Sequence, residues 1–127
     1  MGIAYAAVKI KKFRDEAEPI ELMMKVDSGS LMLTIPEWVQ REFDFPLVRK
    51  ERVKFADGRT AELDVVADVE LEVCGRRGVF EALVLPGREY GLLGAVVMGV
   101  LDLILEPREL KLYPNPCSPE MPMTELE

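Results

Sequence analysis

The stretch Val26-Asp27-Ser28-Gly29-Ser30 joins the end of an apolar strand to a tight polar turn. Apolar side chains stand at every second position from residue 20 to residue 26, which is the pattern of a half-buried β-strand. This pattern places Asp27 where the strand ends, on a turn and outside the core. Gly29 suits a backbone that bends sharply or lets another chain approach closely. The stretch therefore predicts a carboxylate that is presented by a turn at the end of a strand.

Most of the remaining chain has the pattern of short strands separated by turns. Apolar alternation predicts further strands at residues 5–13, 31–35, 52–55, 61–65, 69–73, 79–85 and 110–113. Asp57-Gly58 predicts one hairpin turn, and residues 74–78 predict a second. A capping-box pattern from Thr34 to Glu37 and the apolar run that begins at Leu92 predict two short helices. We therefore expect an all-β fold with a closed or nearly closed barrel-like core and one or two short helices.

Composition narrows the classes of function that the chain can have. Its 127 residues are enough for one domain, and its net charge of −7 argues against nucleic acid and against an anionic membrane surface as partners. The absence of histidine excludes His-dependent triads and His metal ligands, and we expect no metal and no cofactor. The chain starts without a signal-peptide pattern, and its longest apolar stretch, residues 91–105, is shorter than the roughly 20 residues that cross a bilayer. We expect a cytoplasmic protein.

The order of these elements resembles the retroviral-type (retropepsin-like) aspartic proteases. Val26-Asp27-Ser28-Gly29 is similar to the family's Asp-Thr/Ser-Gly triplet, and the Asp57-Gly58 hairpin follows about thirty residues later, where the family has its flap. Residues 73–79 resemble the hairpin that follows the flap, and Leu92-Leu93-Gly94 resembles the apolar-apolar-Gly motif before the terminal helix. The resemblance covers about residues 5–115 and implies the acid-protease barrel of that family.

The resemblance also implies roles for particular residues, with Asp27 as the catalytic carboxylate. The other implied site residues are Ser28, Gly29 and Ser30 in the active-site loop, Ala56, Asp57, Gly58 and Arg59 in the flap, and Leu92, Leu93 and Gly94 in a supporting loop. The protease domain would span residues 1–113, and we expect the Pro-rich tail at 114–127 to be disordered. Two features depart from the family: Ser stands where Thr is commoner, and the flap tip is charged where viral flaps are Gly-rich and apolar.

The chemistry of aspartic proteolysis needs two carboxylates that are close enough to share one proton. One accepts a proton from the attacking water while the other donates a proton to the scissile carbonyl. This chain has one suitable Asp-Ser-Gly, because neither Asp57-Gly58 nor Asp102-Leu103 is a copy of it. The site would therefore be built from Asp27 of two chains across a two-fold axis, in a homodimer that hydrolyses extended polypeptide.

Each of these residues also has a structural interpretation. Asp27 can cap a turn, Ser28 can be a solvated hydroxyl or can brace the two aspartates across the axis, and Gly29 can serve turn geometry alone. Asp57-Gly58 is a hairpin turn whether or not it acts as a flap. Leu92, Leu93 and Gly94 fit core packing beneath the active-site loop better than contact with substrate. Two functions stay open: an aspartic endopeptidase, and a non-catalytic dimerisation or peptide-binding module with the same fold.

Overall fold

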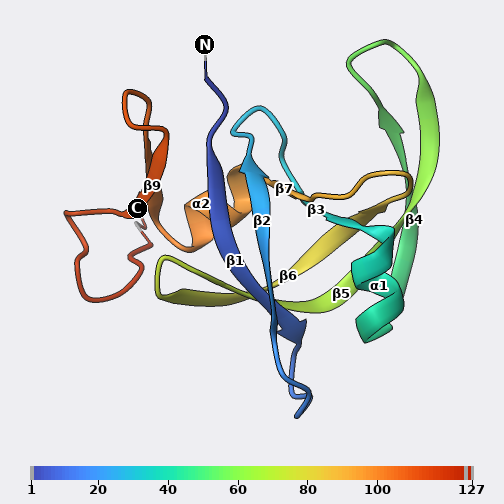
Figure 1. Cartoon of the computed structure of the whole chain (residues 1–127), viewed down its shortest axis with the longest axis horizontal. Helices are drawn as coiled ribbons and strands as arrows, with labels where there is room; N and C mark the ends of the chain where they lie inside the picture. Colours follow the sequence, from blue (N-terminus) through green and yellow to red (C-terminus); the bar gives the residue numbers. More distant parts are fainter. Residues whose placement is uncertain (1, 125, 127) are drawn as a thin grey trace.

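Strands dominate the computed structural model of this chain, which describes residues 2–124 and 126 (Figure 1). The strands are β1 (Tyr5–Lys12), β2 (Ile20–Val26), β3 (Leu33–Pro36), β4 (Leu47–Lys54), β5 (Thr60–Val73), β6 (Arg76–Leu85), β7 (Leu92–Leu93), β8 (Leu103–Glu106) and β9 (Lys111–Pro114). Two short helices accompany them, α1 (Glu37–Phe43) and α2 (Ala95–Val100). Within the described part of the chain, neither helix is long and apolar enough to cross a membrane.

Six strands close into a barrel. The order in the large sheet is β1-β2-β7-β3-β6-β5-β4, and β1 also pairs with β5, from Val8 opposite Val73 to Lys12 opposite Val69. This second pairing joins the two ends of the sheet and leaves β4 outside the closed ring, bonded to β5. Closure pairs β1 with β5, so within the large sheet a free edge is left at β4. The prediction of an all-β barrel with one or two short helices is confirmed.

The alternation that predicted the strands determines which side chains fill the barrel. In β1, Ala6, Val8 and Ile10 are buried while the residues between them are exposed, and Met24 and Val26 of β2 are buried in the same way. In β5, a register shift between Val66 and Val69 lets the long strand bend. Its first half therefore pairs with β4 and its second half pairs with β1. β5 thus connects the core to a projecting hairpin.

Both predicted hairpins are present, with one change in extent. Strands β4 and β5 form the first around Asp57-Gly58, and it projects from the same side of the barrel as the turn after β2 (Figure 1). The second, β5–β6, turns on Cys74 and Gly75 alone, because Arg76 already pairs with Val73. The predicted five-residue connection at 74–78 is therefore shorter in the structure.

The predicted helix after Thr34 forms, but its predicted cap does not. Residue Thr34 is buried in β3, Pro36 occupies the N-cap position, and no side chain caps the helix. The fixed φ of proline is compatible with a helix start, and packing of α1 against β3 and β6 holds it there. The capping-box interpretation was wrong, although the helix itself was predicted.

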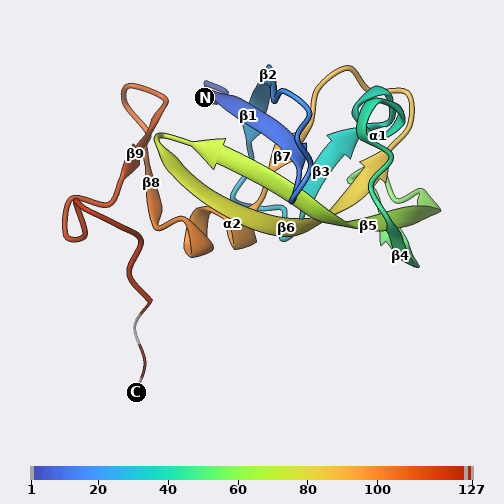
Figure 2. The ribbon, with the colours of Figure 1, turned by 90° about the horizontal axis from the view of Figure 1, so that it is seen from below.

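The C-terminal part of the chain forms a separate small sheet beside the barrel (Figure 2). Strand β8 pairs with β9 from Leu103 opposite Pro114 to Glu106 opposite Lys111. Beyond β9, the Asp102 carboxylate accepts hydrogen bonds from Asn115 Nδ2 at 3.0 Å, from the Ser118 hydroxyl and from the backbone N–H of Met123 at 3.2 Å. The predicted disorder of residues 114–127 stays a prediction, although these contacts hold part of that segment against the barrel.

Candidate functional site

The loop that carries Asp27 is held by backbone hydrogen bonds to β7 and α2. The Asp27 N–H donates to the carbonyl oxygen of Leu93 at 2.9 Å. In return, the carbonyl oxygens of Ser30 and Leu31 accept hydrogen bonds from Ala95 at 2.7 Å and from Val96 at 3.0 Å. The loop is thus bonded on both sides of the Asp27 side chain, and its position is fixed by the barrel.

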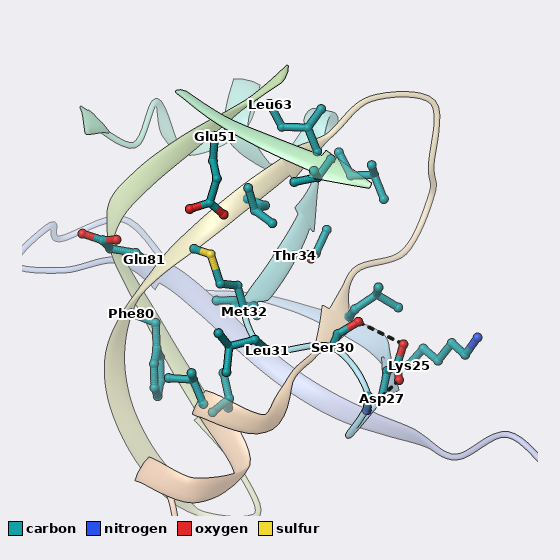
Figure 3. A pocket seen from close by; sticks show the side chains of 18 of the residues that line it. Lys25, Asp27, Ser30, Leu31, Met32, Thr34, Glu51, Leu63, Phe80 and Glu81 are labelled. Atoms are coloured by element: carbon teal, nitrogen blue, oxygen red, sulfur yellow. Dashed lines mark hydrogen bonds between the residues drawn. The ribbon is translucent and has the colours of Figure 1, made fainter. Parts of the chain in front are cut away.

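The half-buried Asp27 carboxylate is oriented by its own turn. Oδ1 accepts a hydrogen bond from the Gly29 N–H at 3.1 Å, and Oδ2 accepts one from the Ser30 hydroxyl at 3.1 Å (Figure 3). These bonds suit a turn cap and also suit a positioned catalytic carboxylate, because both need a fixed side chain. Ser28 is exposed, and none of the hydrogen bonds found among the described side chains involves it. Its bracing role stays a prediction.

Two glycines allow the close packing under this loop. A Cβ at Gly94 would lie 2.6 Å from the carbonyl oxygens of both Leu31 and Met32, and one at Gly91 would lie 2.3 Å from that of Thr34. These distances are far below van der Waals contact with backbone atoms that cannot move aside. By contrast, a Cβ at Gly29 would meet the Asp27 Oδ1 at 3.3 Å. The fold therefore demands glycine at positions 91 and 94, whereas a methyl group at position 29 would meet only the Asp27 carboxylate, in a tight contact.

The tip of the β4–β5 hairpin is braced internally. The Asp57 carboxylate accepts hydrogen bonds from the Arg59 N–H at 3.0 Å and from Arg59 Nε at 2.6 Å. These bonds lower the pKa of Asp57, so the tip carries an ion pair at neutral pH. The Arg59 guanidinium also lies 5.7 Å from the centre of the Phe55 ring. Gly58 has a φ of +90°, which its place in the turn requires. Whether this hairpin acts as a flap stays a prediction.

A groove of about 1040 Å³ runs from the Asp27 loop to this hairpin. Its volume is at the upper end of the range for ligand pockets in proteins. Leu31, Met32 and Thr34 lie in its middle (Figure 3). Phe55 and Ala56 of the hairpin also line it. The groove therefore brings the predicted active-site loop and the base of the predicted flap to one surface, although they are far apart in the sequence.

Charged side chains line both ends of this groove (Figure 3). Arg49 donates to Glu81 at 2.8 Å and lies 3.4 Å from Glu51, and the bond to Glu81 raises the pKa of Arg49. This charge cluster lies away from Asp27, whereas Lys25 lies beside Asp27 (Figure 3). Because all of these side chains contact solvent, each ion pair contributes little to stability and mainly shapes the surface that a ligand meets.

The predicted site residues fall into three groups in the structure. Asp27, Gly29, Ser30, Ala56 and Leu92 line the groove. Ser28 is exposed and does not line it, and Asp57, Gly58 and Arg59 form the exposed hairpin tip. Leu93 and Gly94 are buried beneath the loop, which fits the packing interpretation.

Sequence reasoning missed several groove residues. Arg49, Glu51 and Glu81 come from β4 and β6, and no local pattern links those strands to Asp27. Lys25 could have been found, because it lies two residues before Asp27 in an alternating strand and therefore on the same face.

Comparison of the sequence with models of known protein families gives no match, and comparison with curated proteins gives none either. The groove and its residues are therefore the features that indicate a function.

Proposed function

We propose that this protein is an aspartic endopeptidase whose active site forms between two copies of the chain. The observation that supports this most is the placement of Asp27, a fixed carboxylate in a groove that is also lined by the base of a projecting hairpin. An extended polypeptide in the groove would lie along the carboxylate. A second Asp27 from a partner chain would supply the other half of a proton-sharing pair.

The residues of the chain allow a consistent set of roles in this proposal. One Asp27 accepts a proton from the attacking water, and its mate donates a proton to the carbonyl oxygen of the scissile bond. The backbone hydrogen bonds that Asp27 donates to Leu93 and that Ser30 accepts from Ala95 keep the loop in place, so little reorganisation accompanies the reaction. Gly29 leaves room beside the carboxylate for the substrate backbone. The protease works without metal or cofactor, in the cytoplasm, on polypeptide and not on nucleic acid or membrane.

The second candidate is a peptide-binding or dimerisation module without catalysis. The charged hairpin tip favours it, because the Asp57–Arg59 ion pair is strongly hydrated and would have to approach the bound chain on closure. Both candidates predict that peptides bind in the groove, and they differ in whether the bound peptide is cut.

The experiment that separates them is cleavage of a proteome-derived peptide library between pH 3 and pH 8, read by mass spectrometry. We expect cleavage by the wild-type protein at acidic pH and none by Asp27→Asn, which keeps the side-chain shape and removes the shared proton. Asp68→Asn is the matched control, because Asp68 is exposed and lies in β5 away from the groove residues. Cleavage that persists in Asp27→Asn would contradict the proposal, and binding without any cleavage would favour the module.

A further inference from the structure

Several charged residues of the groove have no role in the proposed reaction, and of these Lys25 is nearest to Asp27 in the sequence. Lys25 lies two positions before Asp27 in β2, and the buried Met24 and Val26 alternate with them. Lys25 and Asp27 therefore share the face of the strand that points away from the core, and both line the groove. Figure 3 shows the two residues next to each other at one end of it, with the Lys25 side chain extending away from the Asp27 carboxylate.

Nothing in the fold neutralises the Lys25 ammonium. Its neighbours across the sheet are Tyr5 in β1 and Leu92 in β7, and neither carries a charge. Among the described residues, no ion pair and no side-chain hydrogen bond involves Lys25. By contrast, Arg49, another basic residue of the groove, is already bonded to Glu81 and Glu51. Lys54 and Arg88 also line the groove, but both are far from Asp27 in the sequence. Lys25 is a half-buried residue whose charged end has no ion-pair partner among the described residues.

We propose that Lys25 is a specificity-determining residue that selects polypeptides with an Asp or Glu side chain next to the scissile bond. This inference rests on the proposed function, because it takes Asp27 as the point at which the chain is cut. A side chain adjacent to the scissile bond would pass Asp27. The flexible Lys25 side chain starts beside Asp27 and carries its ammonium away from the carboxylate, to the outer edge of the groove, where an acidic side chain of the substrate can meet it. An acidic side chain there gains a charge-assisted contact, whereas a basic one meets a like charge. A contact of this kind, partly exposed to solvent, changes kcat/KM by about fivefold.

The test uses three decapeptide pools that are identical except for one central residue, fixed as Glu, Gln or Lys. We expect the wild-type protein to cut the Glu pool about fivefold faster than the Gln pool and the Lys pool most slowly. Lys25→Met should make the Glu and Gln pools equal, and Lys25→Glu should invert the order. Lys111→Met, which removes the same charge on β9 outside the groove, should keep the wild-type order. Equal cutting of Glu and Gln pools by the wild type, or a preference that survives Lys25→Met, would overturn the inference.

Two further measurements separate a selective role from a structural one. The preference should shrink in 1 M salt, because added ions screen an exposed charge pair, whereas a packing role for Lys25 would not respond to salt. Binding of the same pools to the Asp27→Asn protein keeps the inference testable if nothing is cut. Tighter binding of the Glu pool that is lost with Lys25→Met supports selection by Lys25 even if the protease proposal fails. Equal binding of all pools contradicts it.

Discussion

The backbone N–H of Asp27 donates a hydrogen bond of 2.9 Å to the carbonyl oxygen of Leu93, which lies 66 residues further along the chain. This bond continues the short parallel pairing of β2 with β7, in which Val26 stands opposite Leu93. Asp27 is therefore the first residue after the part of β2 that pairs with β7. Its position depends on how closely β7 and the residues after it can approach the loop.

The close approach at Gly94 gives the first prediction. Gly94→Ala would place a methyl group 2.6 Å from the carbonyl oxygens of Leu31 and Met32, and we expect it to lower the free energy of unfolding by about 1–3 kcal/mol. Gly99→Ala is the matched control, because a Cβ there meets nothing within 4 Å inside α2. We expect that control to be neutral or to stabilise by up to about 1 kcal/mol. Thermal and urea unfolding measure both variants, and equal stabilities would contradict the packing account.

Gly29 gives a prediction of the opposite kind. Its Cβ would meet the Asp27 carboxylate at 3.3 Å and no backbone atom, so Gly29→Ala should lower the free energy of unfolding by no more than about 1 kcal/mol, less than Gly94→Ala. The same methyl group stands where the substrate backbone would pass, and we expect cleavage to fall at least about tenfold. A variant that keeps full activity would show that this glycine serves the turn alone.

A third prediction concerns acid pH, at which the proposed activity operates. The bonds from Ser118 and Asn115 hold the pKa of Asp102 below its ordinary value of 3.8. A carboxylate with a lowered pKa stabilises the fold fully above its ordinary pKa, and the contribution disappears as the pH falls through the lower folded value. Asp102→Asn should therefore reduce Tm at pH 7, and its difference from the wild type should shrink below about pH 4. Asp68→Asn, at an exposed residue, should show no such difference. A difference independent of pH would show that charge is not the cause.

The fourth prediction concerns assembly. Because the chain has one Asp-Ser-Gly, we expect sedimentation equilibrium to detect a dimer at tens of micromolar. Specific activity should fall on dilution below the dissociation constant. A protein that is monomeric at these concentrations and keeps constant specific activity would have a site within one chain.

The strands could be predicted from sequence because their burial alternates with period two, as in Ala6, Val8 and Ile10 of β1. The hairpin at Asp57-Gly58 could be predicted from its turn residues alone. Strand β8 was missed, because Leu103, Ile104 and Leu105 continue the apolar run of α2 and their partner in β9 lies across a turn. The pattern is local, whereas the pairing that defines this strand is not.

The candidate site could likewise be predicted only where its residues are close together in the sequence. Asp27 and its turn were found because strand end and turn residues are adjacent in sequence. The groove was not found, because Arg49, Glu51 and Glu81 lie on β4 and β6. These strands are placed beside the Asp27 loop only by their pairing with the bent strand β5. Likewise, a glycine can be seen in a sequence, but the difference between Gly94 and Gly29 depends on distances to backbone atoms that only the fold provides.

The measurement that tests the account most directly is a mixing titration of wild-type protein with Asp27→Asn. At a fixed amount of wild type, equal added variant should reduce the cleavage rate to about one half after subunit exchange, and a threefold excess should reduce it to about one quarter, because mixed dimers hold a single carboxylate of the pair. Asp68→Asn, added in the same amounts, should raise the rate about twofold and about fourfold, because every dimer then holds both carboxylates. A cleavage rate that stays constant as Asp27→Asn is added would contradict an active site shared between two chains.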